Sequence, residues 1–87
     1  MNYLHYQLHV GANELIQISL DRQAYVRLLD DVNYGLYRKG ARYRYYGGLA
    51  KQSPVTVRAP RPGRWHLVID LGGFAGTVRA SVRTIRG

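Results

Sequence analysis

Residues 64–71 read RWHLVIDL, and this stretch decides the fold class of the chain. Every second side chain is large and apolar: Trp65, Leu67, Ile69 and Leu71. The positions between them hold His66, Val68 and Asp70. A period of two is the period with which side chains alternate across a β-strand, so we expect a strand with one fully apolar face. Trp65 shares that face with Leu67 and Ile69, which predicts that it lies in the core.

The same period recurs along most of the chain. It predicts seven short strands: six over residues 3–10, 14–20, 24–29, 42–46, 64–71 and 77–85, and one between Pro54 and Pro60 that contains Val55 and Val57. Glycine, proline and asparagine occupy the turns between them. Seven short strands at this spacing are typical of an all-β fold, a two-sheet sandwich or a jelly roll. With 87 residues, the chain forms one domain, residues 1–87.

The alternation breaks after residue 29, where one helix is expected. Asp30 or Asp31 suits the N-cap position, and Gly40 suits the left-handed position after a helix. Gly35 weakens such a helix by about 1 kcal/mol relative to alanine. We therefore predict one short helical insertion, over residues 32–39, in an otherwise β-structured chain.

The segment GGFAG, residues 72–76, separates the last two predicted strands. A glycine-containing loop of this length predicts a hairpin. In that hairpin Asp70 would lie diagonally opposite Arg79 and pair with it. The segment lacks the Lys-Ser/Thr ending and the following helix of a phosphate-binding loop. We therefore interpret it as a turn.

Charge is the most unusual property of the composition. Thirteen Lys and Arg residues face five Asp and Glu residues, which gives a net charge of +8. Eleven of the thirteen are Arg, whose planar guanidinium binds phosphate or carboxylate through two hydrogen bonds. From residue 32 to residue 69 there is no acid at all, whereas bases and aromatic residues are interleaved. This pattern is typical of surfaces that contact phosphates and stack on flat rings.

The candidate anion-binding residues lie in this acid-free segment: Arg38, Arg42, Arg44, Tyr46, Lys51 and Arg64. On a strand over residues 42–46, the side chains of Arg42, Arg44 and Tyr46 share one face. The alternative is that Tyr43 and Tyr45 belong to the core and the arginines form a solvated surface. Exposed charge is ordinary on proteins and favours this alternative. The lack of compensating acids favours a binding site, because unopposed bases repel one another.

Few residues of the chain are spaced so that they could form a catalytic or a metal-binding site. The chain has no cysteine. His5 and His9 share a strand face but lie about 13 Å apart, too far to bind one metal ion. His66 and Asp70 are separated by a similar distance, so Asp70 cannot orient His66 in a Ser-His-Asp triad. We therefore expect a chain that is not an enzyme and that uses no metal and no cofactor.

The chain is also expected to be a soluble cytoplasmic protein. Residues 1–6 lack the charged start and apolar run of a secretion signal, and apolar runs elsewhere span only a few residues. These runs are far shorter than a membrane-spanning segment.

Four pieces of the sequence carry a resemblance: LLDDVNY (28–34), YRYYGG (43–48), SP (53–54) and GRWHLVIDLGGFAGTVRASV (63–82). With these pieces the chain resembles a family of short basic bacterial β proteins known only as a domain of unknown function. Some members of that family carry this unit ahead of a TIR domain. The resemblance implies a sensing or interaction module in bacterial signalling or defence, and it implies no catalytic residues.

Three functional hypotheses follow. The first is a non-enzymatic binding module for an anionic ligand, whether nucleic acid, nucleotide or another polyanion. The second is a protein-interaction or homo-oligomerising module whose surface is the outer face of Tyr3, His5, Gln7, Tyr25 and Arg27. The third, carbohydrate binding, rests on fold analogy alone.

Overall fold

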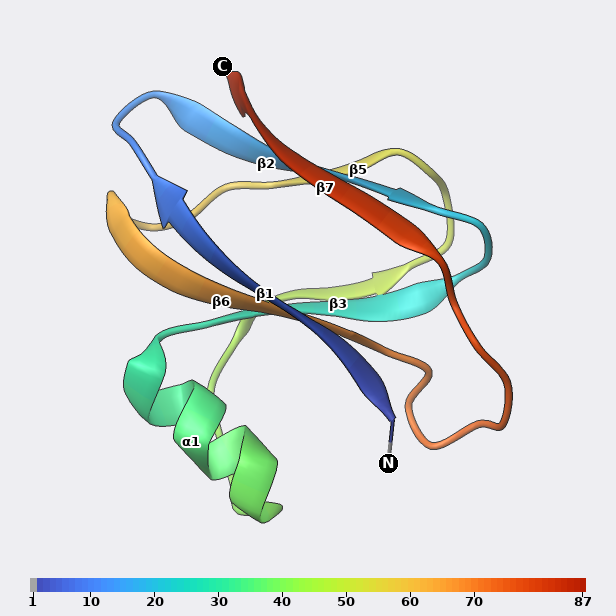
Figure 1. The fold of residues 1–87 in the computed structure, drawn as a ribbon. Coiled ribbons are helices and arrows are strands. Elements are labelled where there is room, and N and C mark those ends of the chain that lie inside the picture. Colours follow the sequence, from blue (N-terminus) through green and yellow to red (C-terminus); the bar gives the residue numbers. More distant parts are fainter. Residues whose placement is uncertain (1) are drawn as a thin grey trace.

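Seven strands and one helix form within residues 2–87, the part of the chain that the computed structural model describes (Figure 1). The elements are β1 (Tyr3–Val10), β2 (Glu14–Leu20), β3 (Ala24–Leu29), α1 (Asp31–Lys39), β4 (Tyr46–Ala50), β5 (Val55–Val57), β6 (Gly63–Asp70) and β7 (Ala80–Arg86). All neighbouring strands pair antiparallel. One sheet has the order β1-β6-β3-β4 and the other the order β5-β2-β7. The all-β, two-sheet sandwich with one short helical insertion is thus confirmed.

The core lies between the two sheets and is built from every second residue of the strands. Its buried members are Val10, Ile16, Ile18, Ala24, Val26, Leu28, Ala50, Val57, Trp65, Leu67 and Ile69. Trp65 is only 1% exposed, which confirms its predicted place in the core. Its indole Nε1 donates to the carbonyl oxygen of Arg61 at 3.0 Å, so the one polar atom of this side chain keeps a partner.

The last two strands do not form the predicted hairpin. β6 lies in the four-stranded sheet and β7 in the three-stranded sheet, so the chain between them crosses from one sheet to the other (Figure 1). The predicted pair of Asp70 and Arg79 is therefore wrong: Asp70 bonds instead with Arg27 of β3. Alternation identifies a strand and its buried face, but it does not say which strand becomes its neighbour.

The predicted strand over residues 42–46 is also wrong, because β4 begins only at Tyr46. Residues 41–45 have no regular secondary structure and return beside α1, where the backbone N–H of Arg44 donates to Asn33 Oδ1 at 2.7 Å. Gly47 and Gly48 follow directly after the predicted strand and were expected to end it, but they lie inside β4. Gly47 has φ 122°, and a Cβ there would lie 2.2 Å from the carbonyl oxygen of Val26. Glycine is required at this position because two backbones approach too closely for a side chain.

Two glycine substitutions are expected to have opposite effects on stability. Gly47→Ala is expected to lower the free energy of unfolding by more than about 1 kcal/mol, because it adds a Cβ that clashes and a φ that alanine disfavours. Gly35→Ala, inside α1 with open space around it, is expected to raise the free energy of unfolding by about 1 kcal/mol. Urea unfolding of both variants measures the difference. Equal effects of the two substitutions would contradict this account of Gly47.

Helix α1 begins and ends as its sequence predicts. Asp30 is the N-cap, and its side chain accepts from the backbone N–H of Asn33 at 2.8 Å. Gly40 takes the left-handed conformation and donates to the carbonyl oxygens of Leu36 and Tyr37. The helix lies on the outer face of the four-stranded sheet, away from the other sheet (Figure 1). There Tyr37 packs with Leu29 and Val68 in a second, smaller core. Among residues 2–87, no helix has the length and apolar character needed to cross a bilayer.

Candidate functional site

The first polar network under α1 surrounds the buried carboxylate of Asp70. Arg27 donates from Nε to Oδ2 at 3.0 Å and from Nη2 to Oδ1 at 3.3 Å. The hydroxyl of Tyr37 donates at 2.7 Å, and the backbone N–H of Gly72 donates at 2.8 Å. The Asp70 side chain is fully buried, and four donors satisfy its two oxygens. The network therefore ties together β3, β6, α1 and the chain after β6.

Burial and hydrogen bonding act in opposite directions on the titration of this network. Burial by itself raises the pKa of Asp70, but the hydrogen bonds from Arg27, Tyr37 and Gly72 together hold that pKa below its ordinary value. Burial likewise raises the pKa of Tyr37, and the hydrogen bond to the Asp70 carboxylate raises it further. Burial lowers the pKa of Arg27, but the hydrogen bond and the charge of Asp70, with smaller contributions from Tyr43 and Tyr45, together raise that pKa above its ordinary value. Asp70 and Arg27 are therefore a charged pair in the folded protein.

Three tyrosine rings enclose the Arg27 guanidinium. Its Cζ lies 4.6 Å from the ring centre of Tyr25, 5.0 Å from that of Tyr45 and 5.9 Å from that of Tyr43. The cation therefore contacts aromatic faces on one side and a carboxylate on the other. Since Arg27 is only 12% exposed, it is not available to bind an external anion.

The second polar network joins α1 to β1 and β6 through two histidines (His5 and His66). His66 Nε2 bonds with Oδ1 of Asp31, and His66 Nδ1 lies 2.9 Å from His5 Nε2. His5 Nδ1 then lies 3.1 Å from the hydroxyl of Tyr34, which lies 3.2 Å from the hydroxyl of Tyr3. The Tyr34 ring is stacked on both imidazoles, at 4.1 Å from His5 and 4.5 Å from His66.

The histidine network is not predicted by the sequence. His5 and His66 are 61 positions apart and meet only because β1 pairs with β6 in the register that sets Gln7 opposite His66. The sequence shows only that each histidine lies in a strand with period-two alternation, on the face opposite to the apolar side chains. This pattern becomes a contact only when the two strands are known to be neighbours.

The predicted interaction surface of Tyr3, His5, Gln7, Tyr25 and Arg27 does not form as an open face. The side chains of Tyr3 and His5 contact Tyr34, and Arg27 lies against Tyr43 and Tyr45. Only Gln7 of the five is exposed. The outer face of the sheet is apolar and aromatic enough to be covered by a helix, and α1 with its return segment covers it.

Most of the positive charge has no acidic partner. Among residues 2–87, only two of the thirteen bases form ion pairs with acids: Arg27 with Asp70, and Arg64 with Asp31 at 2.9 Å. The other eleven are all exposed: Arg22, Arg38, Lys39, Arg42, Arg44, Lys51, Arg58, Arg61, Arg79, Arg83 and Arg86. Each of the five acids already accepts a hydrogen bond from another group. The net charge of the surface is therefore not balanced locally.

Four of the six predicted anion-binding residues belong to the layer built by α1. Arg38 lies in its last turn, with Cζ 5.8 Å from the ring centre of Tyr34. Arg64 contacts the first turn through Asp31. Arg42 and Arg44 lie in the return segment beside the helix. We call the exposed bases of this layer, with Lys39 included, the basic α1 layer: Arg38, Lys39, Arg42, Arg44 and Arg64.

The other two predicted residues, Tyr46 and Lys51, lie elsewhere. Tyr46 is paired with Leu28, whose side chain points into the core, and its ring contacts the edge of Trp65. It therefore lies at the rim of the inner face of the sheet. Lys51 follows β4 at the end of the sheet opposite to Arg64. The exposed aromatic residue of the α1 layer is instead Tyr45, which is 38% exposed and was expected in the core.

A family model described as a domain of unknown function matches residues 1–87, the whole chain. The chain belongs to the DUF1883 family. No curated protein and no solved structure matches it. The resemblance seen in the sequence is thus confirmed at the level of a domain of unknown function.

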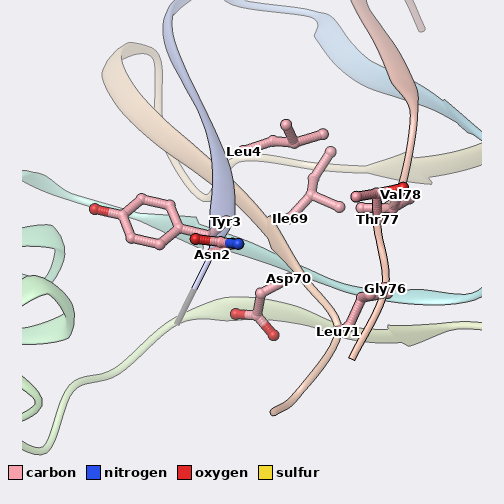
Figure 2. Close-up of a pocket in the computed structure, with 9 residues that line it drawn as sticks. All are labelled: Asn2, Tyr3, Leu4, Ile69, Asp70, Leu71, Gly76, Thr77 and Val78. Atoms are coloured by element: carbon pink, nitrogen blue, oxygen red, sulfur yellow. The ribbon is translucent and has the colours of Figure 1, made fainter. Parts of the chain in front are cut away.

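The concavities of the DUF1883 domain lie away from the basic α1 layer. One of about 180 Å³ opens at the end of the sandwich, where Leu4 and Ile69 point toward Val78 while the Tyr3 ring points the opposite way (Figure 2). No base lines it. A larger hollow of about 530 Å³ includes Phe74, which is 79% exposed, and a single base, Arg22. Neither hollow gathers the guanidinium groups, and the bases of the basic α1 layer lie on the exposed surface.

Proposed function

We propose that this DUF1883 chain is a non-enzymatic binding module for a phosphate-rich polyanion, with single-stranded nucleic acid as its ligand. The observation that carries the proposal is the set of eleven exposed bases without an acidic partner in residues 2–87, four of which fall between residues 38 and 44. Such a surface repels itself, and a polyanion that releases its counterions relieves this repulsion.

The layout of the bases favours an extended ligand over a single phosphate. The bases come from three neighbouring segments: Arg38 and Lys39 from the last turn of α1, Arg42 and Arg44 from the return segment, and Arg64 from β6 beside the first turn of α1. Arginine forks on separate segments can each bind a different phosphate of one strand. Tyr45, exposed beside them, offers a ring on which a base can stack.

No catalytic step is part of the proposal, because the polar side chains beneath the layer are engaged with one another. Asp70 accepts four hydrogen bonds, and each nitrogen of His5 and His66 has a partner. A group that acts as nucleophile or general base must instead face the substrate. These networks hold α1 on the sheet and thereby position the bases that α1 carries.

Salt titration tests the proposal. Fluorescence anisotropy would measure binding of labelled single-stranded DNA and RNA of about 16 nucleotides, with inorganic polyphosphate as an unlabelled competitor. We expect binding that weakens steeply between about 50 mM and about 200 mM salt. Stronger binding of the oligonucleotides than of polyphosphate would support stacking on Tyr45, whereas equal binding would indicate phosphate recognition alone. Absence of binding at low salt would show that the bases form only a solvated surface.

A further inference from the structure

The histidine network under the basic α1 layer has a defined direction of hydrogen bonding. The Asp31 carboxylate can only accept, so His66 Nε2 carries a proton and, in the neutral ring, Nδ1 accepts from His5 Nε2. His5 Nδ1 then accepts from the hydroxyl of Tyr34, whose oxygen accepts from Tyr3. With both imidazoles neutral, every link of the chain is a satisfied hydrogen bond.

The same five groups can hold one additional proton without losing a bond. If His66 is protonated on both nitrogens, Nδ1 donates to His5 Nε2 and the His5 proton moves to Nδ1. His5 Nδ1 then donates to Tyr34, and Tyr34 donates to Tyr3. The added positive charge lies on His66, beside the Asp31 carboxylate. The network is thus a proton-binding site in which the donor and acceptor of each hydrogen bond from His66 to Tyr3 exchange roles when the proton binds.

A second proton has no place in this network. With both imidazoles charged, two N–H groups would face each other across 2.9 Å. Burial lowers the pKa of His5, and the nearby charges of His66 and Arg38 lower it further. The groups that face the pair are Asp31, Tyr34 and Arg38 from α1, Tyr3 from β1 and Arg64 from β6. Uptake therefore stops at one proton.

This proton site is in direct contact with the proposed binding surface. Arg38 lies over the Tyr34 ring that covers both imidazoles, and Arg64 shares the Asp31 carboxylate with His66. We propose that binding of a polyanion to the basic α1 layer is coupled to uptake of one proton by the His5–His66 pair, an inference that rests on the proposed function. A bound anion offsets the repulsion between Arg38 and the imidazoles, so ligand and proton stabilise each other's binding.

The sign of the coupling follows from linkage. If the complex holds more protons than the free protein, affinity rises as the pH falls through the range in which the pair takes up its proton. At constant ionic strength we expect the dissociation constant for single-stranded DNA to fall about fivefold between about pH 7.5 and about pH 5.5. Phosphodiesters do not titrate in this range, so the change reports on the protein.

The test compares the whole chain with two single variants. His66→Gln removes the ring that carries the added charge and keeps an amide that can hydrogen bond, and we expect it to bind independently of pH. His9→Gln is the matched control: it removes the third histidine, which is exposed and outside the network. It is expected to keep the pH dependence. Calorimetry of the unmodified chain in two buffers of different ionisation enthalpy counts the protons taken up, without relying on any variant.

The outcomes separate this inference from the proposed function. Salt-sensitive binding that does not vary with pH, or a calorimetric count of zero protons, overturns the coupling and leaves polyanion binding standing. A pH dependence that persists in His66→Gln or disappears in His9→Gln also overturns it. No binding of DNA at either pH overturns the proposed function and the coupling with it.

Discussion

Asp70→Ala is expected to lower the free energy of unfolding by about 3–5 kcal/mol. The substitution leaves the Arg27 guanidinium, which is only 12% exposed, without its carboxylate. It also removes the acceptor of the Tyr37 hydroxyl and of the Gly72 backbone N–H. Unpaired buried charge is among the most destabilising changes that a core can undergo, and the loss is a large fraction of the stability of a small domain. Urea unfolding measures it.

Two comparisons show whether burial of the charged pair causes the loss. Asp21→Ala removes an exposed carboxylate that accepts one bond from the backbone N–H of Arg79, and we expect it to cost about 1 kcal/mol or less. The double variant Arg27→Met/Asp70→Ala is expected to lose less than the sum of the two single variants, because it leaves no unpaired cation. Strict additivity of the two substitutions would contradict the assignment of Asp70 and Arg27 as a coupled pair.

Replacing Arg38, Arg42 and Arg44 together by glutamine is expected to have the largest effect on binding. An exposed ion pair contributes about 0.5 kcal/mol, so the loss of three contributes about 1.4 kcal/mol, and we expect roughly a tenfold loss of affinity for single-stranded DNA. The salt dependence should change as well. Each lost phosphate contact on a single strand reduces the slope of log K against log salt by about 0.7. Anisotropy titrations at several salt concentrations measure both quantities.

A charge-matched control distinguishes a site from net charge alone. Arg58, Arg79 and Arg86 are exposed and belong to the three-stranded sheet or its flanks, on the other side of the sandwich from α1. Their replacement by glutamine removes the same three charges, and we expect it to change the salt slope much less. Equal losses in the two triple variants would mean that binding follows net charge and that the basic α1 layer is not a distinct surface.

Much of the fold could be predicted from local patterns. The strand around residues 64–71 was predicted because apolar side chains at a period of two produce one buried face wherever the strand lies. The helix was predicted because Asp30 and Gly40 satisfy its ends through contacts with their own neighbours in the chain. Such interactions span only a few residues, so they depend little on the rest of the molecule.

The candidate site could be predicted only in part. The surplus of bases over acids, and its concentration in residues 38–44, is a property of composition that survives any arrangement of the chain. The grouping of Lys51 and Tyr46 with the arginines was an inference from sequence proximity. The structure does not group these residues, because Lys51 lies at the opposite end of the sheet from Arg64 and Tyr46 points to the inner side of the sheet.

The sequence by itself determined where the helix and all the strands except β4 lie, which faces of those strands are apolar and how much positive charge the chain carries. Only the tertiary structure decided that β6 pairs with β1 and β3 rather than with β7. Because of that pairing, His5 bonds with His66 and Arg27 bonds with Asp70. The physical reason is that residue spacing specifies a buried face, whereas strand order depends on how all the faces pack at once.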